Sequence, residues 1–169
     1  IQRGEGLGAD GFAFSRAGLT QGRFDESAYR PAVVSWAKTT FGDAIAPNGR
    51  PIWQNFVTWF GGSKVVDAEG KPLVVYHGTQ SDIAIFDPNK TFDRGLYFTD
   101  HPGNAEEYGA MAGTGDVSII PTYLSLQRPL VIDAEGQLFS EEMQNDLENK
   151  IRSNRNGRKY DGIIVKNVD

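Results

Sequence analysis

The four consecutive apolar residues Leu73–Tyr76 limit the possible folds of this chain more than any other segment. A strand that is apolar at every position has both faces covered, so we expect it in the centre of a sheet. Lys64–Asp67 precedes it across Ala68-Glu69-Gly70-Lys71, a sequence typical of a hairpin turn. This hairpin is the expected start of the sheet.

Helical and strand-like patterns alternate around this hairpin. Apolar spacing, proline starts and glycine stops predict helices at 31–41, 51–60, 102–111 and 140–155. Short β-rich runs predict strands at 96–98, within 119–132 and at 160–165. The expected fold is α+β, a split and mostly antiparallel sheet with peripheral helices. We expect an N-terminal arm with short helices at 1–60 and a core at 61–169.

Composition excludes several kinds of site. The chain has no cysteine, and its only histidines are His77 and His101, so neither a thiolate zinc site nor a paired-histidine metal site can be assembled. A net charge of −5 argues against broad binding to nucleic acid or to an anionic membrane, and no long apolar span is present. A small molecule or a protein is the expected partner. The chain opens at Ile1 without an initiator methionine, and we expect it to be a piece of something longer.

Residues after the apolar strand have the chemistry of a nicotinamide pocket. His77 can hydrogen-bond a ribose hydroxyl, and Gly78 lets backbone amides approach a carboxamide. Tyr97 and Tyr108 can flank a cationic pyridinium ring. The alternative is structural: a satisfied histidine at a strand end and two tyrosines packed in the core. Gly95 can likewise serve only to relieve crowding.

The order of these motifs resembles the ADP-ribosyltransferase superfamily of the histidine-tyrosine-glutamate type, above all the domains in phage and mobile-element polyvalent proteins. The resemblance covers roughly residues 55–169. It rests on Trp59-Phe60-Gly61-Gly62-Ser63-Lys64-Val65-Val66-Asp67, Gly70-Lys71-Pro72-Leu73-Val74-Val75-Tyr76-His77-Gly78-Thr79, Gly95-Leu96-Tyr97-Phe98-Thr99-Asp100, Tyr108 and Tyr160-Asp161-Gly162-Ile163-Ile164-Val165.

The resemblance implies a role for each pocket residue. His77 would hold the 2′-hydroxyl of the adenosine-side ribose of NAD, while Gly78 and the Thr79 hydroxyl engage the carboxamide. Tyr97 and Tyr108 would sandwich the nicotinamide ring. No metal is required, because nicotinamide is already a cationic leaving group and the protein supplies geometry and charge stabilisation.

Two further positions follow from the same resemblance. Arg94 and Gly95 would lie at the pocket mouth, where Arg94 could meet the NAD pyrophosphate. Many relatives keep a glutamate on a late strand, but this chain offers only Asn167 or Asp169 after Val165. Either one takes that role, or the residue lies beyond Asp169. Strand alternation puts Asn167 on the face of Val165.

The expected activity is transfer of ADP-ribose from NAD to a macromolecular acceptor, with release of nicotinamide. The acceptor would be a protein of the bacterial host. The domain would act in the cytoplasm of that host and would be delivered by, or packaged with, a phage. One alternative is NAD hydrolysis. Another is a non-catalytic NAD-binding or structural domain of a larger phage protein. Nuclease activity has little support, since no basic groove or second histidine pairing is visible in the sequence.

Overall fold

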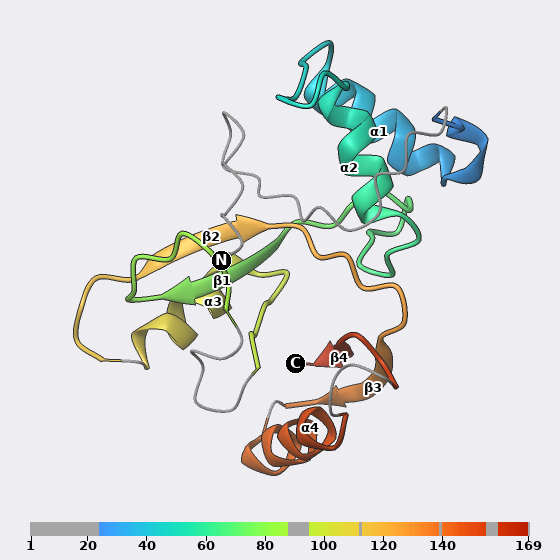
Figure 1. The fold of residues 1–169 in the computed structure, drawn as a ribbon. Coiled ribbons are helices and arrows are strands. Elements are labelled where there is room, and N and C mark those ends of the chain that lie inside the picture. The colour runs from blue at the N-terminus through green and yellow to red at the C-terminus, as the bar shows by residue number, and fades with distance from the viewer. Residues whose placement is uncertain (1–23, 88–94, 112, 139, 155–158, 169) are drawn as a thin grey trace.

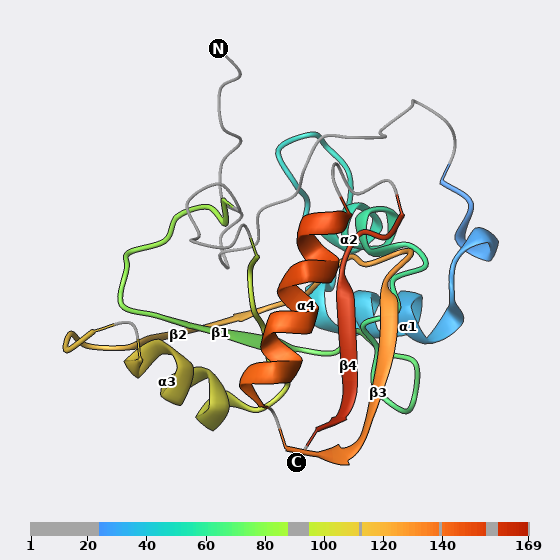
Figure 2. The same cartoon turned by 90° about the horizontal axis from the view of Figure 1, so that it is seen from below.

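The structure is a computed structural model, which describes residues 24–87, 95–111, 113–138, 140–154 and 159–168. Figures 1 and 2 show the helices α1 and α2 at one end of the molecule, the unit of β1, β2 and α3 on one side, and the unit of β3, β4 and α4 on another. The elements are, in order, η1 (Glu26–Ala28), α1 (Pro31–Phe41), α2 (Ile52–Phe60), β1 (Val75–Thr79), α3 (Pro102–Ala110), β2 (Ser118–Thr122), β3 (Leu130–Gln137), α4 (Glu141–Ser153) and β4 (Ile163–Val168). The α+β class is confirmed.

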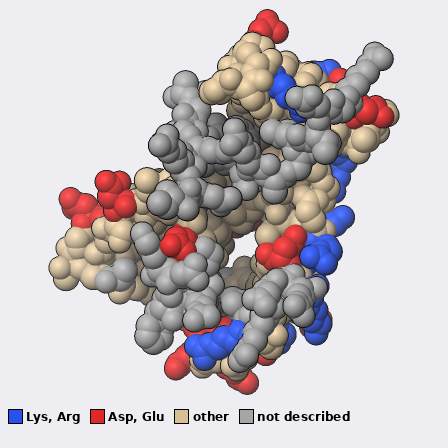
Figure 3. Space-filling view, viewed as in Figure 1, with Lys and Arg blue, Asp and Glu red and all other residues tan. Residues whose placement is uncertain are grey.

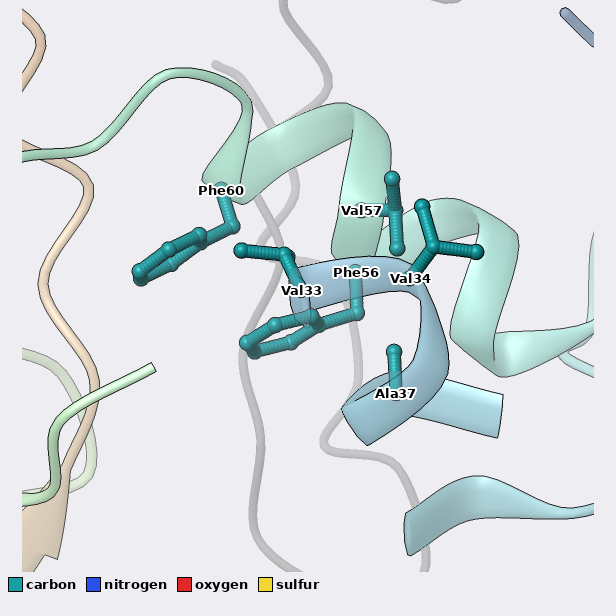
Figure 4. Close-up of a cluster of buried hydrophobic side chains, with 6 residues drawn as sticks. All are labelled: Val33, Val34, Ala37, Phe56, Val57 and Phe60. Carbon is teal, nitrogen blue, oxygen red and sulfur yellow. The ribbon is translucent and has the colours of Figure 1, made fainter. Parts of the chain in front are cut away.

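The main hydrophobic core lies between α1 and α2. Proline stands at the first position of α1, and Gly42 and Gly61 end the two helices, each with a φ of 53° that favours glycine. Both predicted helices are confirmed. Figure 4 shows the cluster of buried side chains between them, formed by Val33, Val34, Ala37, Phe56, Val57 and Phe60.

Hydrogen bonds join the end of α2 to the connector between β2 and β3. The Ser125 hydroxyl donates to the Trp59 carbonyl at 2.8 Å, and the Gln127 amide donates to the Phe60 carbonyl at 2.8 Å. These contacts satisfy carbonyls that a helix end leaves without an internal partner. The helical pair is therefore anchored to the segment that leads into β3.

The hairpin expected before β1 is reduced to a single antiparallel bridge between Val66 and Pro72. Proline has no backbone N–H to donate, so the ladder cannot continue through Pro72. The turn itself is present, because the Asp67 N–H donates to the Lys71 carbonyl at 3.0 Å and Gly70 has a φ of 78°. The regular strand begins only at Val75.

Strand β1 has neighbours on both sides. It pairs with β2 in an antiparallel register that sets His77 opposite Ile120, and Tyr76 forms an isolated bridge with Thr99 on its other edge. The strand expected at residues 96–98 is wrong, because only Thr99 makes a bridge. The Tyr97 carbonyl instead accepts a hydrogen bond from the His77 ring at 2.8 Å.

The second sheet is parallel and lies at the C-terminal end of the chain. Strands β3 and β4 pair in parallel, with Val131 opposite Ile164. Figures 1 and 2 place α4 against one face of this pair. Ser140 caps α4 as predicted, since its hydroxyl accepts from the Met143 N–H at 3.2 Å. No helix in the described ranges is long and apolar enough to cross a membrane.

Candidate active site

Helix α3 lies directly on the backbone of β1 because two glycines meet there. A Cβ on Gly78 would stand 1.6 Å from the Ala105 carbonyl oxygen, and a Cβ on Gly109 would stand 3.0 Å from the Gly78 carbonyl carbon. Neither position has room for a side chain. The contact holds α3 tightly against the strand, and Tyr108 is the residue just before the second glycine.

The two tyrosines predicted to form a ring clamp do lie together. The Tyr97 and Tyr108 rings are stacked, with centroids 5.9 Å apart and planes inclined by 27°. They come from different segments, Tyr97 from the stretch before Thr99 and Tyr108 from α3. Tyr108 is 40% exposed, so the pair is reachable from solvent.

The His77 ring is linked to this pair by a hydrogen bond to the backbone carbonyl of Tyr97. Its Nδ1 is 2.8 Å from the Tyr97 carbonyl oxygen, which can only accept, so Nδ1 carries the proton. The neutral ring then presents Nε2 as an acceptor. Phe86 and Phe98 pack on the imidazole with centroids at 5.3 and 5.5 Å.

His77 and the tyrosine rings approach β1 from different sides. The Cβ direction of Gly78 points at α3, and side chains alternate along a strand, so the His77 side chain lies on the face away from α3. Tyr108 belongs to α3 itself. A ligand that touches both His77 and the tyrosine pair must therefore pass around the edge of β1 where Tyr97 lies.

Two neighbouring polar groups stabilise the end of β1. The Thr79 hydroxyl oxygen accepts from the Ser81 N–H at 3.0 Å, which makes a turn directly after the strand. The Gln80 amide donates to the Gly109 carbonyl at 2.9 Å, and its oxygen accepts from the Gly115 N–H at 3.0 Å. The roles of Gln80 and Gly109 are not predictable from the sequence, since both depend on the docked position of α3.

Asn167 lies at the end of β4 in a hydrogen-bonded group of its own. Its amide donates to the Asp133 carboxylate at 2.8 Å, and the same carboxylate accepts from the Glu135 N–H at 2.9 Å. The Glu135 N–H, the Asn167 amide and the charge of Lys166 lower the pKa of Asp133. Asn167 has a φ of 54°, so the expected strand alternation does not extend through it. Asp133 is a polar neighbour that sequence reasoning missed.

Gly95 is buried, and a Cβ there would meet the Tyr97 ring at 3.3 Å. This fits the structural role of relieving crowding beside a tyrosine. Arg94 and Asp169 lie outside the described residues. Within the described ranges, no group of three or more histidine, aspartate or glutamate side chains could hold a metal ion.

A histidine-bearing strand backed by a tyrosine-bearing helix, within an α+β fold, is the arrangement implied by the resemblance to ADP-ribosyltransferases. The chain belongs to the family described as ADP-ribosyltransferase in polyvalent proteins, whose model matches residues 67–169. The matched range contains β1, both tyrosines and β4. No curated protein and no solved structure matches the chain.

Proposed function

We propose that this domain transfers ADP-ribose from NAD to a macromolecular acceptor and releases nicotinamide, with the nicotinamide ring bound at Tyr97 and Tyr108. The observation that carries the proposal is the stacked tyrosine pair, with its centroids 5.9 Å apart, in a chain of the ADP-ribosyltransferase family. Tyrosine faces attract a cationic ring, and the positively charged nicotinamide of NAD is such a ring. The acceptor on this proposal is a protein of the bacterial host of a phage or mobile element.

Binding requires the two rings to move apart. A flat ring between two others needs a spacing of about 7 Å, since each stacked contact takes about 3.5 Å. The stacked pair, with its centroids 5.9 Å apart, must therefore open to admit a third ring. Tyr108 is fixed through α3 and the glycine contact, whereas Tyr97 lies outside any regular strand. Tyr97 is the ring that shifts.

His77 contributes through the ring nitrogen that does not face Tyr97. Nε2 of the neutral ring would accept a hydrogen bond from a ribose hydroxyl on the adenosine side, while Nδ1–H keeps the Tyr97 carbonyl in place. Gly78 and Thr79 would offer backbone and hydroxyl groups to the carboxamide. Arg94 and Gly95 would border the dinucleotide. His77 thus both binds the ligand and positions one wall of the ring clamp.

The transfer step requires charge stabilisation more than proton transfer. Cleavage of the bond between nicotinamide and ribose leaves positive charge at the ribose carbon, and the acceptor nucleophile then bonds to that carbon. We assign the polar group near that ribose to Asn167 or Asp169. The Asn167 amide nitrogen donates to Asp133, so its oxygen would be the atom that accepts from a ribose hydroxyl.

The decisive experiment is incubation of the domain with NAD labelled in the adenylate part and a bacterial lysate. Labelled macromolecules are the expected result. Free ADP-ribose and nicotinamide without labelled macromolecules would mean that water is the acceptor. Intact NAD with measurable binding would mean that the domain only binds it.

Replacing Tyr108 with alanine is expected to weaken NAD binding by about 0.5–2 kcal/mol, because one face of the clamp is lost. ADP-ribose lacks the nicotinamide ring, so its affinity should change little. Calorimetry with both ligands on the wild type, Tyr108→Ala and Tyr108→Phe checks this, and the phenylalanine variant should bind nearly as the wild type does. Equal losses for NAD and ADP-ribose would mean that Tyr108 supports the fold instead.

His77 permits a sharper comparison, because asparagine can replace one ring nitrogen but not the other. In His77→Asn the side-chain N–H can still donate to the Tyr97 carbonyl, yet the acceptor at Nε2 is gone. We expect this variant to fold normally and to lose about 0.5–1.5 kcal/mol of NAD affinity. His77→Ala should lose more, since Tyr97 is released as well. Wild-type affinity in a folded His77→Asn protein would contradict the ribose contact.

A further inference from the structure

A groove of about 590 Å³ lies apart from the tyrosine pair, between the segment after α2, the connector into β3 and the β3–β4 sheet. Four cationic side chains line it, from Arg30, Lys64, Arg128 and Lys166, against a single carboxylate from Asp67. The whole chain carries a net charge of −5, so this gathering of cations runs against its overall charge. In Figure 3, Lys and Arg side chains follow one another down the right-hand edge of the molecule.

Among the described residues, no ion pair involves a cation of this groove, although the charge of Lys166 acts on Asp133, its partner in the β3–β4 register. The ion pairs formed among the described residues involve other cations, Lys38, Lys150 and Arg152. Arg30 donates to the carbonyls of Ser63 at 3.1 Å and Gly62 at 3.5 Å, which fixes its position, and it forms no ion pair with a carboxylate of the described part of the chain. Cations gathered on a shallow, solvated surface create a local positive potential that attracts anionic segments.

The floor of the groove is aliphatic. Val131 is 51% exposed and lies opposite Ile164 in the parallel register. Burial alternates along β3, so Val131 lies on the face of the sheet that is turned away from α4. Among the described residues that line the groove, no side chain is aromatic. Nucleic-acid bases and the rings of NAD bind best to aromatic platforms, so neither fits this floor well.

We propose that this groove docks an acidic stretch of polypeptide in which carboxylates alternate with aliphatic side chains. Carboxylates would meet Lys64, Arg128 and Lys166, and the aliphatic side chains would cover Val131 and Ile164. The role of this groove in capturing the acceptor protein rests on the proposed transferase function. Docking would raise the local concentration of the acceptor beside the domain and would steer its approach.

The test is the affinity of a labelled peptide of alternating glutamate and valine, measured by fluorescence anisotropy over a series of salt concentrations. Lys64→Glu, Arg128→Glu and Lys166→Glu are each expected to weaken binding roughly threefold to tenfold, with a larger effect at low salt. Lys159→Glu is the matched control, because Lys159 is exposed, lies outside the groove and gives the same change in net charge. It should bind the peptide as the wild type does.

Equal binding by the groove variants and the Lys159→Glu control would overturn the proposal. So would tighter binding of an oligothymidylate that is lost in the same three variants, since a nucleic acid would then be the ligand. NAD affinity, measured on the same proteins, is expected to stay at the wild-type value. If the wild type binds no NAD but binds the peptide through these cations, the transferase function fails and the docking site stands. If NAD turnover is normal but peptide binding does not depend on these charges, the docking site is disproved and the transferase function is not.

Discussion

Replacing Gly78 with alanine is expected to lower the free energy of unfolding by about 3 kcal/mol or more and to abolish NAD binding. The added methyl group would stand 1.6 Å from the Ala105 carbonyl oxygen and 2.6 Å from its carbon. Both are backbone atoms within α3, so no side-chain rotation can relieve the clash. Overpacking usually costs 1–3 kcal/mol, and a clash with a helix backbone belongs at or above the upper end.

The helix can escape this clash only by moving away from β1. Tyr108 moves with it, so the ring clamp and the fold are damaged by the same change. Chemical denaturation measures the stability, and calorimetry measures the NAD affinity. Gly103→Ala is the control from the same helix, where the new methyl group meets only the exposed His101 ring at 3.2 Å. Alanine favours helix over glycine by up to about 1 kcal/mol, so that variant should be as stable as the wild type or more so. A Gly78→Ala protein with unchanged stability would show that α3 does not dock as described.

The sequence predicted the helices better than the strands because helix signals are local. Pro31, Gly42 and Ser140 mark boundaries that the structure confirms. Strand assignment at 96–98 failed because pairing depends on partners distant in the sequence. There, the His77 side chain takes the Tyr97 carbonyl and only one bridge forms. The parallel pairing of β3 with β4 likewise depends on tertiary contacts, which local sequence patterns do not encode.

At the candidate site, too, local features were predictable from the sequence and tertiary contacts were not. The chemistry of two tyrosines after a histidine was enough to expect Tyr97 and Tyr108 together, and their rings do stack. The packing role of Gly78 was not predicted, because it exists only once Gly109 faces it across the docked helix. The hydrogen bond between Asn167 and Asp133 was not predictable either, since the two residues lie on different strands that meet only in the fold.

A second large effect is expected at Ser63, whose side chain is fully buried. Its hydroxyl donates to the Leu124 carbonyl at 2.7 Å and accepts from the N–H groups of Val65 at 3.3 Å and Leu126 at 3.2 Å. Ser63→Ala leaves all three backbone groups without this partner. Each buried unsatisfied group costs about 1–3 kcal/mol, and partial relaxation reduces the sum, so we expect a loss of about 3 kcal/mol.

Ser35→Ala is the matched control, because Ser35 is exposed in α1 and alanine is the better helix former there. Its free energy of unfolding should equal or slightly exceed that of the wild type. Ser63 joins the helical pair to the connector before β3, whereas the tyrosine pair depends on the contact between α3 and β1. The folded fraction of Ser63→Ala should therefore bind NAD with wild-type affinity, in contrast to Gly78→Ala. A loss of stability below about 0.5 kcal/mol would mean that water or a neighbouring group replaces the hydroxyl, and that the buried serine is not what anchors the helices.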